Sequence, residues 1–163
     1  KMAEHTVSLD LADMNRYSND EPFHTDEEYN LLRLLETWWK VDYTQQIPPV
    51  FYLTDKKISH DLSLAPAIKV YEIGEETVGI GLGYIAKKKK LTMNIEIITL
   101  DRTLLFDTKD EVIRILDFCR KNPIPGWDFI YNVSIKRMDP RAGNYHIIIQ
   151  VGLERLVEPI PGI

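Results

Sequence analysis

The sequence is poor in cysteine and histidine and has no long apolar run. Each of these features excludes a class of protein. Cys119 is the single cysteine among 163 residues, which excludes an intrachain disulfide and a cysteine-based zinc site. This usage is typical of a protein made in a reducing cytosol. No stretch approaches about 18 consecutive apolar residues, so we expect no membrane-spanning helix. The first residues also lack the apolar core of a signal peptide.

Positive charge is in short supply as well. The chain has 20 Lys and Arg against 25 Asp and Glu, a formal net charge of −5. A domain whose main partner is nucleic acid is usually net basic. The four consecutive lysines at Lys87–Lys90 are therefore a local feature of an acidic protein.

Motifs for catalysis, cofactors and metals are also missing. The glycines of Gly79–Gly83 do not form a dinucleotide fingerprint, because Tyr84 stands where glycine is needed and no helix follows. They favour a twisted or bulged strand. The four histidines are too scattered to be metal ligands on one element, and Cys119 falls on an apolar helical stripe, as expected for a buried inert thiol. We expect no enzyme, no cofactor and no metal site.

Two segments carry the pattern of amphipathic helices. Residues 1–24 are polar and mixed in sign, and we interpret them as a flexible N-terminal arm in front of a single domain at 25–163. Thr25 to Glu28 has the form of a capping box and predicts a helix over 26–40. A second capping box at Thr108–Glu111 predicts a helix over 109–121, which Pro123 ends.

Alternating apolar residues predict the strands. They lie at 68–73, 77–85, 91–98, 129–136 and 145–154, with turn residues between the last two. Short links between them favour a largely antiparallel sheet. The sequence therefore predicts an α+β fold, with about five strands packed by two helices and a long hairpin.

The order of these elements resembles that of a known family. From Thr25 to Pro159 come a leucine-bearing helix, a proline-bearing link, three strands with a long hairpin, a helix and two strands. This order is similar to that of the tail-completion proteins of long-tailed phages and tailed archaeal viruses, which include tail terminators and neck joining proteins. The segments that carry the resemblance are PAIKVYEI (66–73), LTMNIEII (91–98), DEVIRILDF (110–118) and YHIIIQVGLE (145–154).

The resemblance implies a structural virion protein. Members of this family form a ring, usually of six subunits, that caps the tail tube and joins it to the head or neck connector. DNA passes through the ring without sequence readout, and no catalysis, cofactor or membrane is involved. The resemblance thus implies a protein of the virion tail or neck that assembles in the host cytoplasm, with either the terminator or the neck-joining role.

The candidate interface or lumen residues follow from this picture. We expect Lys87, Lys88, Lys89 and Lys90 to form the tip of a hairpin, where they contact a neighbouring subunit, line the lumen or are simply solvated. The adjacent Trp38 and Trp39 point in different directions on one helix, so only one of them can enter the core. The other is expected to pack against a second surface, which makes Trp39 an interface candidate. Ile130 and Ile148, apolar residues on otherwise polar strand phases, indicate a partly covered outer face.

Two other classes of function stay open at this stage. One is a small nucleic-acid-binding module that uses Lys87–Lys90 together with Arg137 and Arg141. The other is a magnesium-dependent nuclease built on Glu96, Asp101 and Asp107, although the Glu-x-Lys strand pattern common in nucleases is absent.

Overall fold

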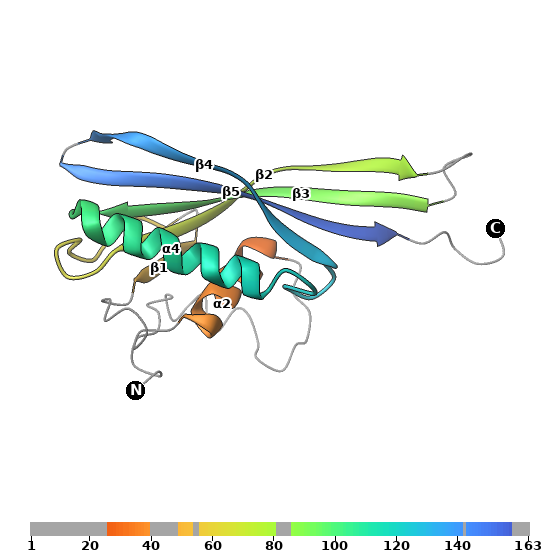
Figure 1. The fold of residues 1–163 in the computed structure, drawn as a ribbon, viewed down its shortest axis with the longest axis horizontal. Helices are drawn as coiled ribbons and strands as arrows, with labels where there is room; N and C mark the ends of the chain where they lie inside the picture. Colours follow the sequence, from red (N-terminus) through yellow and green to blue (C-terminus); the bar gives the residue numbers. More distant parts are fainter. Residues whose placement is uncertain (1–25, 40–48, 54–55, 81–85, 142, 158–163) are drawn as a thin grey trace.

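The computed structural model describes residues 26–39, 49–53, 56–80, 86–141 and 143–157, and the predicted N-terminal arm lies outside these ranges. Two helices and five strands make up this part of the chain (Figure 1). The fold is α+β, as predicted. The elements are α2 (Glu27–Trp38), β1 (Val50–Leu53), β2 (Ala67–Ile80), β3 (Ala86–Thr99), α4 (Arg102–Phe118), β4 (Phe129–Arg141) and β5 (Asn144–Val157).

The strands form one sheet in the order β1-β2-β3-β5-β4. Only the short β1 runs parallel to its neighbour, and the other three pairings are antiparallel. β3 and β5 are the central pair, and each is hydrogen-bonded on both sides along most of its length. β4 is the edge strand on one side of the described sheet.

Both helices lie on one face of this sheet, here called the inner face (Figure 1). The period of two in β3 and β5 directs every second residue toward the helices. The core forms where these residues meet α2 and α4. Its fully buried sheet residues include Leu91, Met93, Ile95, Ile97, Ile147, Ile149, Val151 and Leu153.

The opposite, outer face is covered at one end by residues 56–66. There Tyr52, Ala67 and Ile98 form a second small apolar cluster. The His60 ring holds this segment in place: its Nε2–H donates to the Ala65 carbonyl (2.8 Å), so its Nδ1 accepts from the Tyr52 hydroxyl (2.6 Å).

The first helix starts one residue later than the capping-box pattern predicted. Asp26 is the N-cap, and its carboxylate accepts from the Tyr29 backbone N–H at 3.2 Å. Thr25, the predicted cap, lies outside the described residues. At the other end Trp39 closes the helix in extended conformation and packs edge-on against Phe51, with 5.9 Å between ring centroids.

The predicted start of the second helix was wrong by seven residues. α4 begins at Arg102, with Asp101 as N-cap accepting from the Leu104 N–H at 3.0 Å. Thr108 is buried inside the helix and donates to the Leu104 carbonyl. The buried Leu105 extends the apolar stripe of α4 by one turn toward the N-terminus. The sequence prediction missed this turn because Thr108–Glu111 has the pattern of a helix start.

Two of the predicted strands are in fact one. β2 runs without a break from Ala67 to Ile80, and Gly74 does not end it. A β-bulge at Ile73 absorbs the irregularity, because Glu72 pairs with Met93 and Gly74 pairs with Thr92. The fifth strand of the sheet is instead the short β1, which lies outside the five predicted ranges.

The predicted phase of β4 was wrong over its first residues, where Phe129 and Tyr131 face outward, and agrees with the structure only after a bulge. A bulge between Asn132 and Ser134 moves Ile135 to the inner face, opposite Ile149. Ile130 pairs with Leu153 and is fully buried in the core, so it is not an outer-face residue. A single inserted residue reverses the phase of everything after it, which alternation alone cannot reveal.

An ion pair within α4, and a bond from its arginine to the end of α2, generate a first prediction. Arg114 binds the buried carboxylate of Glu111 through two bonds of 2.7 and 2.8 Å, and its Nη2 also donates to the Trp38 carbonyl at 2.7 Å. Glu111→Ala leaves the guanidinium without this partner. We expect a loss of about 2 kcal/mol in the free energy of unfolding, measured by urea denaturation.

Asp110→Ala on the same helix is the matched control. Among the described residues, Asp110 pairs only with its neighbour Lys109 (3.2 Å) at an exposed position, so a change below about 0.5 kcal/mol is expected. Equal losses in the two variants would mean that the Glu111–Arg114 pair does not hold the helices together.

Candidate functional site

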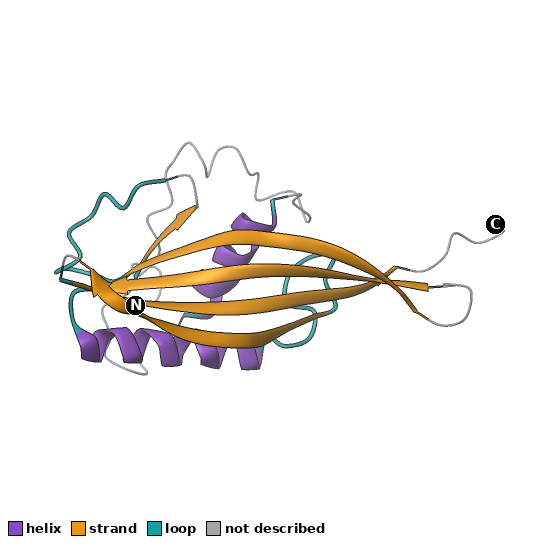
Figure 2. Ribbon diagram, turned by 90° about the horizontal axis from the view of Figure 1, so that it is seen from above, coloured by secondary structure: helices purple, strands orange, loops and turns teal. Residues whose placement is uncertain are grey.

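The sheet is much longer than the helices that cover it. Strands of 14 residues extend about 46 Å, whereas the 17 residues of α4 extend about 25 Å. Figures 1 and 2 show the consequence: β2, β3 and β5 continue past both helices. This uncovered part, with residues 76–80, 86–90 and 154–157, is named the sheet extension.

The apolar side of the sheet changes face within the extension. In the body the inner face is apolar, ending with the cross-strand pair Leu91 and Leu153. One step further the inner face carries Lys89 opposite Arg155. Large apolar side chains now lie on the outer face, which neither α2 nor α4 covers.

We call this group the outer patch. Its apolar side chains come from three strands on one face: Val78 and Ile80 of β2, Leu156 of β5, and Phe129 and Tyr131 of β4. Lys88 of β3 lies between Val78 and Leu156. All five are substantially exposed, and Leu156 reaches 60%. Single exposed apolar residues are ordinary, but a contiguous set on one sheet face is typical of a contact surface.

The charges within the outer patch are paired inside the chain. The Glu154 carboxylate forms ion pairs with the Nζ of Lys88 at 3.1 Å and the Nζ of Lys90 at 3.8 Å. The Tyr131 hydroxyl donates to the same carboxylate at 3.1 Å. Burial, and then the charge of Glu154, raise the pKa of Tyr131 above 10.0, which keeps this hydroxyl a donor. The patch therefore presents apolar groups around two lysines that share the Glu154 carboxylate.

Tyr131 lies flat over the backbone of Gly152, which faces it across the strand pair. A Cβ at Gly152 would come within 2.5 Å of the tyrosine ring, so any larger residue displaces the ring. This close approach explains the glycine in the middle of an otherwise continuous strand. It also fixes one edge of the outer patch.

The structure corrects the predicted position of the lysines. Lys87–Lys90 are not a hairpin tip, because they lie inside β3, paired with β2 on one side and β5 on the other. Residues 81–85, which link the strands, are not among those described. Since β3 is central, the lysines do not protect a sheet edge. Lys88 and Lys90 face outward, while Lys87 and Lys89 face inward, with Lys89 at 3.9 Å from Glu75.

The other candidate residues lie elsewhere. Trp39 is fully buried, so it offers no surface to a partner, whereas its neighbour Trp38 is 39% exposed. Arg137 lies over the Phe106 ring at 5.6 Å on the inner side. The backbone of Arg141 pairs with Asn144, and its side chain is outside the described part.

The predicted basic residues therefore do not converge on one site. Arg137 pairs with Ile147, seven or more residues along β5 from the partners of the lysines, Glu154 to Val157. At about 3.3 Å per residue, this places Arg137 more than 20 Å from the lysine run.

The carboxylates of the nuclease hypothesis also have separate structural roles. Asp101 caps α4, and Glu96 lies on the outer face of β3, where it faces His146 at 3.5 Å. Asp107 is exposed on α4. Across the described ranges, no three His, Cys, Asp or Glu residues are grouped so that they could hold a metal ion. No helix there is long and apolar enough to cross a membrane.

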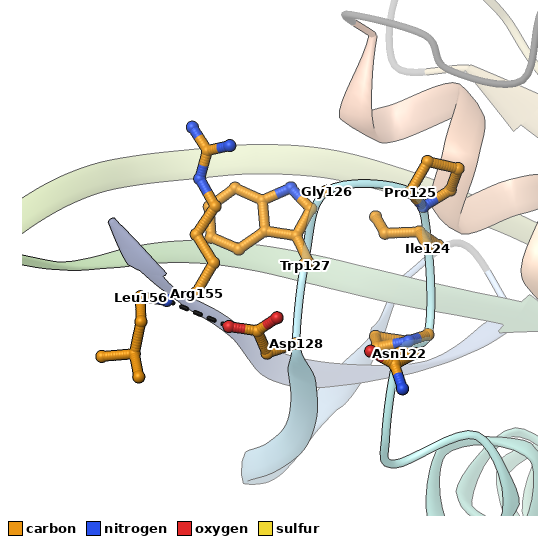
Figure 3. A pocket seen from close by; sticks show the side chains of 9 residues that line it. Asn122, Ile124, Pro125, Gly126, Trp127, Asp128, Arg155 and Leu156 are labelled. Carbon is orange, nitrogen blue, oxygen red and sulfur yellow. Dashed lines mark hydrogen bonds between the residues drawn. The ribbon is translucent and has the colours of Figure 1, made fainter. Parts of the chain in front are cut away.

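A compact junction connects the extension to the helices (Figure 3). The loop over 122–128 turns at Asn122 and Gly126, which both have positive φ, and places the buried Trp127 under Arg155, whose guanidinium lies 5.2 Å from the ring centroid. Asp128 accepts from the Leu156 backbone N–H at 3.0 Å. An open pocket of about 510 Å³ lies along this loop.

The start of α2 completes the junction. The side chains of Asn30 and Trp127 hydrogen-bond the Glu27 carboxyl, yet burial dominates and raises its pKa above 4.5. Nearby, the Glu28 carboxylate accepts from the Glu72 backbone N–H of β2 at 2.8 Å. No signal in the sequence identified this junction, because it joins three segments far apart in the chain.

Comparison with known proteins gives no family for this chain. A scan against protein-family models found no match, and a search of curated proteins found no similar sequence.

The raised pKa of Glu27 generates a second prediction. Folding disfavours the ionised form of the Glu27 carboxyl. The free energy of unfolding therefore decreases as the pH rises through 4.5, the ordinary pKa of a glutamate. Glu27→Gln mimics the protonated carboxyl. We expect the variant to melt at a higher temperature than wild type at pH 7, and the difference to close as the pH falls below 4.5.

Thermal unfolding by circular dichroism across this pH range measures the effect. Glu76→Gln, at an exposed position on the extension, is the control and should show no such crossover. A lower melting temperature for Glu27→Gln at pH 7 would show that attraction to Arg155 outweighs burial.

Proposed function

We propose that the protein is a structural subunit that assembles with copies of itself into a ring, and that the ring serves as a tail terminator or neck joining protein of a tailed virus. The observation that carries the assembly proposal is the outer patch. It is a group of exposed apolar side chains, with Lys88, Lys90 and Glu154 among them, on a sheet extension that α2 and α4 leave uncovered. Burying such a surface against another subunit is the usual way to remove it from water.

The order of elements supports the virion role. The described chain runs helix, short strand, long β2–β3 hairpin, helix and closing strand pair. The resemblance to tail-completion proteins rests on a similar order, a helix, three strands with a long hairpin, a helix and two strands, although β1 takes the place of one of the three predicted strands. In such a ring, DNA passes through the lumen, and contacts to the tail tube and the neck connector occupy the two rims.

The site geometry favours an assembly role over the alternative of a nucleic-acid-binding module. Phosphate binding needs lysines that are free to exchange their counterions for phosphate. Here Lys88, Lys89 and Lys90 each have a carboxylate within 4 Å, and Arg137 lies at a distance from them. The central position of the lysines in the sheet suits a role in binding β3 to its neighbours.

The proposal predicts a large assembly in solution. We expect a mass near six times 19.0 kDa by light scattering after size exclusion at micromolar concentration, and rings in electron micrographs. Because apolar burial holds the subunits together, the mass should persist in 1 M NaCl, where exposed ion pairs are screened over about 3 Å.

A matched measurement separates the two classes of function. Binding of a random-sequence DNA duplex should be weak for the free protein and nearly unchanged in Lys88→Gln. A monomer of 19.0 kDa at every concentration and salt, combined with tight and steeply salt-dependent DNA binding, would contradict the assembly proposal and favour the nucleic-acid-binding module.

A further inference from the structure

A second exposed apolar group lies in the helix layer, apart from the outer patch. Trp38 at the end of α2 and Phe118 at the end of α4 contact each other, with ring centroids 5.0 Å apart. Phe118 is 64% exposed. The bond from Arg114 to the Trp38 carbonyl fixes the helix ends, so the aromatic pair is held rigidly. Rigid, exposed aromatic residues are typical anchors of protein interfaces.

The outer patch contains a hollow that suits such an anchor. An open pocket of about 190 Å³ lies there, with Ile80, Phe129 and Leu156 as its apolar walls. Lys88 and Glu154, which are paired with each other, line the same pocket. A cavity of roughly 150 Å³ is enough to hold one benzene molecule. The pocket can therefore receive one aromatic side chain without breaking an ion pair.

We propose that Phe118 of one copy inserts into the outer-patch pocket of the next copy of this chain. The inference rests on the proposed ring and identifies the two surfaces that build it. Trp38 packs beside the inserted ring, over the neighbouring apolar side chains of the patch. The paired charges of Lys88, Lys90 and Glu154 form a polar surround, as in interfaces with an apolar centre and a polar rim.

The positions of the two surfaces determine the symmetry of this contact. Trp38 and Phe118 end the two helices, which lie on the inner face (Figure 1). The strand register places the side chains of the outer patch on the opposite face of the sheet. Two different surfaces make a head-to-tail contact, which closes into a ring when the rotation per subunit divides a full turn. A self-complementary patch would instead give a two-fold dimer.

Substitution of the anchor and of the pocket wall tests the contact. Phe118→Glu and Leu156→Glu should each weaken assembly at least thirtyfold, the factor expected for an anchor residue worth about 2 kcal/mol. Leu64→Glu is the control, because Leu64 is 67% exposed in the segment over 56–66, away from both surfaces. All three side chains are exposed, so circular dichroism should report an unchanged fold.

Crosslinking tests the head-to-tail geometry directly. In a Cys119→Ala background, Asp117→Cys marks the end of α4, and Val78→Cys marks the outer patch. With a short bis-maleimide, a mixture of the two variants should give a crosslinked dimer that neither variant gives alone. Crosslinking of Val78→Cys by itself would show a patch-to-patch dimer and overturn the inference.

The outcomes separate this inference from the proposed function. If Phe118→Glu and Leu156→Glu both keep the ring while wild type forms one, the inference is wrong and the ring proposal stands. If wild type is a monomer under every condition and no crosslink forms, both are wrong. Loss of the ring in both variants, with the ring retained in Leu64→Glu, supports the inference.

Discussion

The mismatch in length between the sheet and its helices is the constraint on which the rest of the structure depends. An apolar sheet face must be buried against another layer of the structure, and α2 and α4 cover only part of the length of these strands. The inner face is apolar as far as Leu91 and Leu153 and becomes charged at Lys89 and Arg155, where the cover ends. Because the outer face becomes apolar over the same interval, the extension has its own amphipathic design, opposite in sense to that of the body.

The extension can serve as a docking element only if it is held rigidly relative to the helices. Three contacts between distant parts of the chain hold it. The Arg155 guanidinium stacks on the Trp127 ring, and the carboxylates of Asp128 and Glu28 accept from the backbone N–H groups of Leu156 and Glu72, respectively. On the other side of the core, Arg114 ties α4 to the end of α2. The outer patch and the Trp38–Phe118 pair are thereby kept in one fixed relation. A ring closes only when that relation is the same in every subunit.

The lysine run becomes intelligible within this arrangement. Four lysines in a central strand would repel one another if they were unpaired. Because side chains alternate along a strand, the lysines are divided between the two faces. On the outer face Lys88 and Lys90 pair with Glu154, and on the inner face Lys89 lies near Glu75. Pairing allows positive residues to occupy the middle of a sheet, because each paired lysine lies within 4 Å of a carboxylate. A surface with such pairs can be buried against another protein at a lower desolvation cost than a cluster of free charges.

The sequence by itself determined the class of fold, the two amphipathic helices and the inner faces of β3 and β5, because these follow from local periodicity and burial. It did not determine the start of α4, the continuity of β2 or the phase of β4. There, Asp101 replaced the apparent cap, and single inserted residues at Ile73 and Val133 shifted the registers. Only the tertiary structure decided which residues form the candidate site. The outer patch and its pocket take residues from β2, β3, β4 and β5, and no local pattern states where a helix stops covering a sheet.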